Sequence, residues 1–238
     1  MTATTRYEQV TASDGGTFEA FCAIPARGRG PGVLLFQEIF GINDNMRGLA
    51  DRLAGEGYVT LVPDMFWRLE PRFERKDESG MADALAMVQR FDRDQGVADI
   101  QAAHAHVLGM GECGGKVGAV GFCLGGTLAF ACAATSRVDG KGIDAAVSYY
   151  GSGNNELLGL LDSVECPLMF HYGLHDPFIP EDKIAEVEQA IEGRDDIELY
   201  RYSAGHAFSN WDAPSMFNAE AADAAWKRTI QFFARHLS

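Results

Sequence analysis

The sequence predicts an α/β fold, in which helices cover both faces of a mostly parallel β-sheet. Short apolar runs alternate with helical patterns along the chain, which is typical of strands joined by helices. Most of these runs are largely apolar without strict alternation, as expected for strands that are buried on both faces. Neither an internal repeat nor a Pro/Ser-rich linker divides the 238 residues, so we expect one domain over residues 1–238.

The expected elements follow in chain order. A half-exposed strand alternates over 17–23, and strands that are mostly buried on both faces are expected at 32–37, 58–62, 116–122, 143–150, 167–172 and 197–202. Helices are expected at 44–56, 79–91, 96–109, 124–135, 181–192 and 216–236, and the polar run 68–80 is expected to be a long surface loop. Asn43 and Gly57 are suitable caps for the first helix. Ligands of such sheets bind at the carboxyl ends of the strands, which is where we look for chemistry.

The charge balance argues against nucleic acid and anionic membranes as partners. Lys and Arg number 20 against 34 Asp and Glu, a net charge of −14 that repels phosphate groups. Residues 117–136 carry no charge, which is long enough for a membrane span. A cluster of glycines splits this run in the middle, so a strand, a tight turn and a helix explain it better.

Cysteine usage and the first residues predict a cytoplasmic protein. The 5 cysteines contain no Cys-x-x-Cys pair and form no regular framework, which favours a reducing compartment. The N-terminus lacks the basic and apolar regions of a secretory signal. We expect a monomer or a small homo-oligomer.

A nucleophile turn joins the predicted strand at 116–122 to the predicted helix at 124–135. Gly121-Phe-Cys-Leu-Gly125 matches the pattern G-x-S-x-G with Cys123 in place of serine. Such a turn needs small residues two before and two after the nucleophile, because the backbone doubles back there. The dipole of the following helix stabilises a thiolate. We therefore predict a catalytic Cys123, with a buried structural cysteine as the alternative.

Two further residues complete a triad in the order that this turn requires. Asp176 follows the strand at 167–172 and His206 follows the strand at 197–202, so both lie at carboxyl ends. His171 and His175 stand beside Asp176, but no third ligand is evident for a metal. We expect neither a metal nor a cofactor.

The chain resembles the dienelactone hydrolases, thiol members of the α/β-hydrolase superfamily. The resemblance covers most of the chain and rests on Gln37-Glu-Ile-Phe-Gly41, Gly115 to Gly126 with its cysteine turn, Tyr149-Tyr-Gly151, Gly173 to Asp176, and Gly205-His206. It implies a single α/β-hydrolase domain. It also implies that Glu38 holds the resting thiol until substrate enters, and that the N–H groups of Ile39 and Leu124 form an oxyanion hole.

The chain departs from the family where the substrate carboxylate binds. Family arginines correspond here to Met81 and Asn210, and the serine after the histidine corresponds to Ala207. Each lost charge-assisted hydrogen bond is worth roughly 1.5–3 kcal/mol. The residues expected to line the substrate pocket are Phe40, Trp67, Met81, Phe208, Asn210 and Trp211.

These patterns predict a hydrolase that cleaves activated esters or enol lactones through Cys123, His206, Asp176 and a thioester intermediate. A broad carboxylesterase for neutral aryl or small acyl esters is the alternative, because the family's arginines are absent. A non-catalytic thiol protein with Cys123 as a redox sensor is a hypothesis from another class. In the two enzyme hypotheses the partner is a small-molecule ester or lactone.

Overall fold

A computed structural model describes residues 3–76 and 78–238. Its eight strands form one sheet in the order β1-β2-β4-β3-β5-β6-β7-β8. The bounds are β1 (Thr4–Thr11), β2 (Thr17–Ile24), β3 (Gly30–Phe36), β4 (Val59–Pro63), β5 (Cys113–Phe122), β6 (Ala145–Tyr149), β7 (Leu168–Gly173) and β8 (Ile197–Tyr202). Strands β3 to β8 are parallel, and β1 and β2 are antiparallel to their neighbours. The predicted α/β class with a mostly parallel sheet is confirmed.

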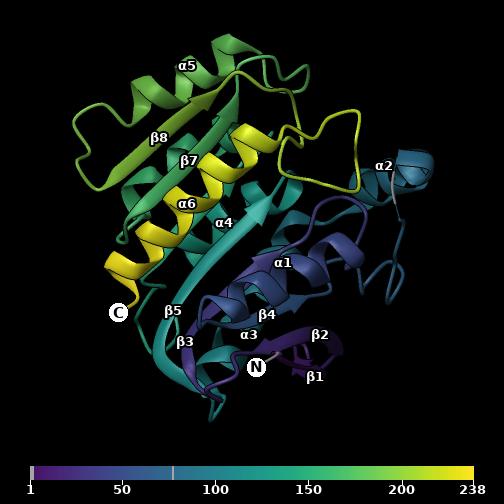
Figure 1. The fold of residues 1–238 in the computed structure, drawn as a ribbon. Helices are drawn as coiled ribbons and strands as arrows, with labels where there is room; N and C mark the ends of the chain where they lie inside the picture. Colours follow the sequence, from purple (N-terminus) through teal and green to yellow (C-terminus); the bar gives the residue numbers. More distant parts are fainter. Residues whose placement is uncertain (1–2, 77) are drawn as a thin grey trace.

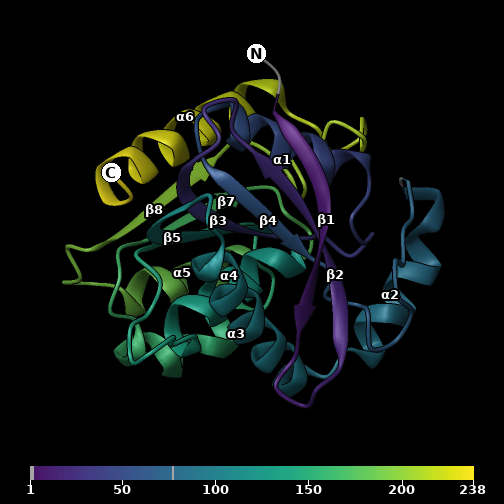
Figure 2. The same ribbon diagram turned by 90° about the horizontal axis from the view of Figure 1, so that it is seen from below.

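Helices cover both faces of this sheet. The bounds are α1 (Asp44–Gly55), α2 (Met81–Arg90), α3 (Arg93–Gly109), α4 (Leu124–Thr135), α5 (Glu181–Ala190) and α6 (Ala219–His236). Helices α1 and α6 lie on one face, while α3, α4 and α5 lie on the other (Figures 1 and 2). Arg52 of α1 stacks over Trp226 of α6, which joins the two helices on their shared face. Helix α2 lies beside these layers (Figure 2).

Some elements differ from the sequence-based expectation. Strand β1 was not predicted, because its largely exposed side chains show no clean alternation of apolar and polar positions. A 3-10 helix, η2 (Asn154–Ser163), follows β6 and was not predicted either. The last helix begins at Ala219 and not at 216, since Asn218 caps it by accepting the N–H of Ala221.

The segment 68–80 is only partly the surface loop that was expected. A second 3-10 helix, η1 (Glu78–Gly80), occupies its end. Phe73 is buried in a second hydrophobic cluster with Phe40 and Phe66. The N–H of Arg75 donates to the Phe40 carbonyl, and Gly41 pairs with Glu74 in an isolated bridge. The segment is thereby attached to the turn that follows β3.

The uncharged run 117–136 forms the end of β5, a tight turn and α4. Among the described residues, no helix is long and apolar enough to cross a membrane. The carboxyl ends of the parallel strands β5, β7 and β8 lie at the same end of the sheet (Figure 1). Cys123, Asp176 and His206 lie in the segments that follow these three ends.

Candidate active site

Cys123 occupies the turn between β5 and α4 with a left-handed backbone, at φ 55°. Such a conformation is rare for a residue with a side chain and stores strain. A Cβ atom on Gly121 would come within 1.9 Å of the Gly125 carbonyl oxygen, and one on Gly125 within 2.2 Å of the Phe36 carbonyl oxygen. Both positions therefore require glycine, and the spacing seen in the sequence has this steric cause.

Cys123, His206 and Asp176 are in line, although they come from three different loops. His206 Nε2 is 3.1 Å from Cys123 Sγ, and His206 Nδ1 is 2.7 Å from Asp176 Oδ2. The imidazole of His206 and the carboxylate of Asp176 are buried, while Cys123 is half-buried. This is the geometry of a nucleophile, a base and an orienting acid.

The electrostatics of the triad favour a charged imidazole. Burial disfavours the charged form, but the Cys123 thiolate and the Asp176 carboxylate outweigh it and raise the pKa of His206 to about 10. The pKa rises because the negative charges of Cys123 and Asp176, one on each side of the ring, stabilise the added proton. The site is therefore suited to a thiolate–imidazolium pair.

We expect an NMR titration of the histidine ring signals to show His206 protonated up to about pH 10. An unfolded histidine loses its proton near pH 6.5, so the folded chain holds the extra proton between these values. The stability that this proton contributes is complete below pH 6.5 and is lost as pH rises through about 10.

The Cys123→Ala variant and the buried His171 provide two controls for this titration. In Cys123→Ala the His206 pKa should fall, because one of the two negative neighbours is gone. Burial lowers the pKa of His171 to about 3, so its ring should stay neutral above pH 5 in both proteins. An unchanged His206 titration in Cys123→Ala would contradict the ion pair.

Glu38 lies in the same site but bonds to different groups than the resemblance implies. Tyr150 Oη donates to Glu38 Oε1 at 3.1 Å, and Asn210 Nδ2 donates to Glu38 Oε2. Burial raises the pKa of Glu38, and the charge of His206 opposes this. The described partner of the Cys123 thiol is His206, and the described side-chain partners of Glu38 are Tyr150 and Asn210.

The two residues named for the oxyanion hole belong to the same corner of the fold. Leu124 opens α4, where the first N–H groups of a helix have no partner within the helix. Ile39 follows β3, which is the neighbour of β5 in the sheet. Both side chains pack against the second hydrophobic cluster, together with Met81 at the start of α2. An apolar wall therefore lies beside Cys123.

Of the six expected pocket residues, three have contacts at the site or its apolar wall. Asn210 bonds to Glu38, while Phe40 and Met81 belong to the second hydrophobic cluster. Phe208 is fully buried and packs against the rings of Tyr149 and Tyr150, behind the triad.

The two tryptophans make their described contacts with other elements. Trp67 stacks on Phe18 of β2 and donates to Asp99 of α3. Trp211 approaches Gly48 and Arg52 of α1. Their large apolar rings are thus used in packing between loops and helices.

Two aromatic residues that the sequence analysis did not place in the site flank the His206 ring. Tyr150 lies 5.1 Å from it and Phe178 lies 5.0 Å from it, measured between ring centroids. Tyr150 could have been suspected because it is the last residue of the strand predicted at 143–150, and it directly follows the observed β6. Phe178 carries no sequence signal beyond its position two residues after Asp176.

The other histidines serve packing or remain outside the site. His171 is fully buried and bonds to Tyr202 and Thr229. Within residues 3–76 and 78–238, no group of three or more His, Cys, Asp or Glu side chains is arranged to hold a metal ion.

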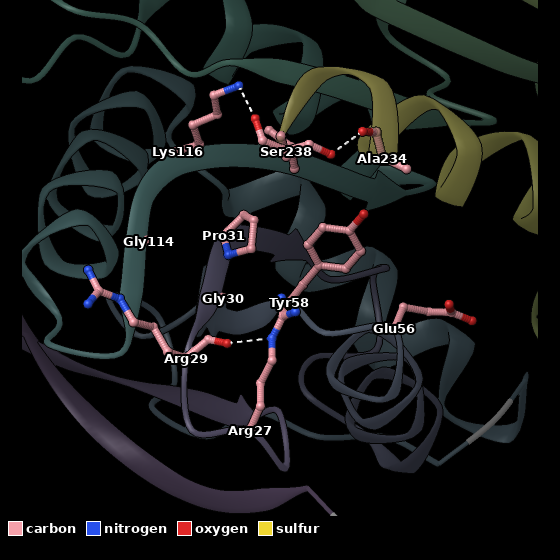
Figure 3. A pocket seen from close by; sticks show the side chains of 11 residues that line it. Arg27, Arg29, Gly30, Pro31, Glu56, Tyr58, Gly114, Lys116, Ala234 and Ser238 are labelled. Carbon is pink, nitrogen blue, oxygen red and sulfur yellow. Dashed lines mark hydrogen bonds between the residues drawn. The ribbon is translucent and has the colours of Figure 1, made fainter.

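A cavity of about 720 Å³ lies where β3 and β5 begin, at the opposite end of the sheet from Cys123 (Figure 3). Two of the basic side chains that line it donate to main-chain oxygens. Arg27 donates to the carbonyls of Arg29 and Gly57, and Lys116 donates to those of His236 and Ser238. This cavity is separate from the triad.

Comparison with known proteins gives a consistent family match. The model of the dienelactone hydrolase family matches residues 18–237. A carboxymethylenebutenolidase of Pseudomonas sp. (strain P51) is 38% identical over 228 residues, which cover 95% of this chain and 93% of that relative. A carboxymethylenebutenolidase of Pseudomonas putida is 35% identical, with 94% of both chains covered.

Solved structures give the same fold. A Klebsiella pneumoniae structure aligns with 99% of this chain and 100% of its own, at a TM-score of 0.85 and 26% identity. A dienelactone hydrolase from Anabaena variabilis aligns over the whole of both chains at a TM-score of 0.74. Its 20% identity supports the fold alone.

Proposed function

This chain belongs to the dienelactone hydrolase family, and from that premise we propose that it cleaves activated esters or enol lactones through Cys123, His206 and Asp176. The chain is a hydrolase of the dienelactone type. One observation carries the mechanism: the continuous contact from Cys123 Sγ through His206 to Asp176. We propose that residues 1–238 act as one catalytic domain on a small-molecule substrate.

In the first half-reaction, the Cys123 thiolate attacks the carbonyl carbon. A C–S bond forms, and the carbonyl electron pair moves to oxygen to give a tetrahedral intermediate. When this intermediate collapses, the C–O bond breaks and the leaving oxygen takes the proton from His206 Nε2. The product of this step is a thioester of Cys123.

In the second half-reaction, water hydrolyses the thioester. His206 Nε2 accepts a proton from the water as its oxygen attacks the acyl carbon, and the C–S bond then breaks to regenerate the thiolate. Asp176 holds the ring in the required orientation through Nδ1. Thiolate is a better leaving group than a simple alkoxide, so substrates with enol or phenol leaving groups are favoured.

Two backbone N–H groups are proposed to stabilise the intermediate. The N–H groups of Ile39 and Leu124 flank the turn that carries Cys123, and each such donor contributes about 3 kcal/mol in sites of this kind. Support comes from the position of Leu124 at the start of α4, where the helix dipole also favours negative charge.

Between the two substrate classes, the bonds of Asn210 favour a neutral ester over an anionic lactone. Asn210, which stands where the family has an arginine, donates to Glu38 and accepts the N–H of Asp212. Its amide is neutral and is already engaged in these two bonds. The charged groups described around His206 are otherwise acidic, with Glu38 and Asp176 on two sides. An anionic lactone would meet repulsion there.

The arginines of the neighbouring loop are engaged elsewhere. Arg68 pairs with Asp99 and Asp14, Arg72 pairs with Glu19, and Arg75 pairs with Asp83. Their ion pairs make them poor replacements for the missing anchor.

The non-catalytic alternative is set aside by the family match. The four other cysteines are free and buried, at positions 22, 113, 132 and 166. Five free thiols agree with the cytoplasmic location that we propose.

We expect kcat/KM for a neutral aryl ester to exceed that for a dienelactone carboxylate by about tenfold or more, because charge-assisted bonds worth roughly 1.5–3 kcal/mol each are absent. Steady-state kinetics with both substrates tests this, with Cys123→Ala as the blank. Added salt should raise only the rate for the anionic lactone, since it screens repulsion. A lactone preference of a hundredfold, about 2.7 kcal/mol, would mean that a cation does anchor the carboxylate.

A further inference from the structure

The imidazole of His206 lies between two aromatic rings that differ in exposure. Tyr150 packs edge-to-face against it at 5.1 Å and is fully buried. Phe178 packs edge-to-face at 5.0 Å, yet 58% of its surface is exposed. An apolar ring held open to solvent against a reactive side chain is the kind of surface that contacts a ligand.

Phe178 is fixed in place by the same carboxylate that orients His206. Asp176 Oδ2 bonds to the imidazole, while Asp176 Oδ1 accepts the backbone N–H of Phe178 at 2.8 Å and that of Ile179 at 3.2 Å. The backbone that carries the Phe178 ring is therefore bonded to the same carboxylate as the imidazole. A ligand that contacts both meets a surface that is already ordered.

The position of the leaving group follows from the proton that it must receive. Its oxygen has to come within about 3 Å of His206 Nε2. Glu38 and Asn210 are buried on one side of the site, and Tyr150 closes another. The acyl group has an apolar wall near Ile39 and Leu124. Of the two aromatic rings that contact the imidazole, only that of Phe178 is exposed, so a leaving group that approaches from solvent can contact it.

We propose that Phe178 is a specificity-determining residue that receives the leaving group, and that it favours aromatic or other planar apolar alcohols. This inference rests on the proposed function, because it assumes that His206 protonates a leaving oxygen. Ring-on-ring contact adds stabilisation beyond the burial of apolar area. The contact is made before the C–O bond breaks and is lost with the alcohol, so it acts on acylation alone.

Two acetate esters separate these effects, because both give the same acetyl thioester of Cys123. One carries a phenol leaving group, and the other carries a small fluorinated alcohol of comparable acidity. In Phe178→Ala, kcat/KM for the aryl ester should fall about tenfold. For the fluoroalkyl ester it should stay within about twofold, and the deacylation rate constant, common to both esters, should not change. Phe178→Leu should lie between wild type and Phe178→Ala.

The matched control is Tyr7→Ala, which removes another exposed aromatic ring from β1 at the opposite edge of the sheet. It should leave both esters unaffected. An equal fall for both esters and for deacylation would overturn the proposal, since Phe178 would then only position His206. No fall for either ester would overturn it as well. If wild-type turnover persisted in Cys123→Ala, the proposed function itself would fail, and this inference with it.

Discussion

Replacing Cys123 with alanine is expected to lower kcat/KM for an activated ester by about four orders of magnitude or more. The reason is the loss of Sγ, the nucleophilic atom that contacts His206 Nε2. Without Sγ no thioester forms, and the remaining binding and oxyanion groups accelerate only the attack of water. Steady-state kinetics against a substrate blank gives the ratio.

Acid quenching during turnover provides the direct evidence for this intermediate. The wild-type peptide that contains Cys123 should carry one acyl group, and the Cys123→Ala peptide should carry none. Cys166→Ala is the matched control, because it removes a buried free thiol where the chain enters β7, away from the triad. An acyl group found on any other residue would contradict the assignment of the nucleophile.

The fold, and the proximity of Cys123, His206 and Asp176, could be predicted because short-range patterns encode them. Gly121 is required by its contact with Gly125 inside the turn, and Gly125 by its contact with Phe36 of β3, yet both stand two residues from Cys123, so the pattern is visible in the sequence. Asp176 and His206 each lie in the loop that follows a strand, three and four residues after β7 and β8 end, and a parallel sheet brings such loops together. Strand β1 escaped because an edge strand with mostly exposed side chains has little hydrophobic pattern to detect.

The environment of the triad could not be predicted, because it depends on contacts between distant side chains. Glu38 and Asn210 are 172 residues apart in the chain and bond directly. Trp67 looked like a pocket residue by composition, yet its ring stacks on Phe18 of the outer strands. Phe178 is distinguished by exposure and by its contact with His206, neither of which leaves a pattern in a single sequence.

Asp176→Asn is expected to lower kcat by about three to four orders of magnitude while the protein stays folded. The carboxylate uses one oxygen for the imidazole and the other for the N–H groups of Phe178 and Ile179. An asparagine can keep its oxygen on the loop, but its NH₂ group then faces His206 Nδ1. The imidazole responds with the tautomer that carries its proton on Nε2, which cannot accept the proton of Cys123.

A comparison of Asp176→Asn with Asp176→Ala separates the two tasks of this carboxylate. Alanine also removes the side-chain acceptor of the loop: the N–H of Phe178 loses its bond to Oδ1, and the N–H of the buried Ile179 keeps only a 3.4 Å bond to the backbone carbonyl of residue 176. The free energy of unfolding of Asp176→Ala should therefore fall by about 1–3 kcal/mol more than that of Asp176→Asn. Urea denaturation measures this difference, and Asp182→Asn on the exposed side of α5 is the control that should change neither property.

Equal stability of the two variants would show that the loop does not depend on Asp176. Equal activity of Asp176→Asn and wild type would remove the carboxylate from the mechanism altogether. Because Phe178 is tied to the same oxygen, Asp176→Ala should also lower the preference for aryl leaving groups, whereas Asp176→Asn should retain that preference at its reduced rate. The carboxylate would then be the group that couples the orientation of the base to the choice of leaving group.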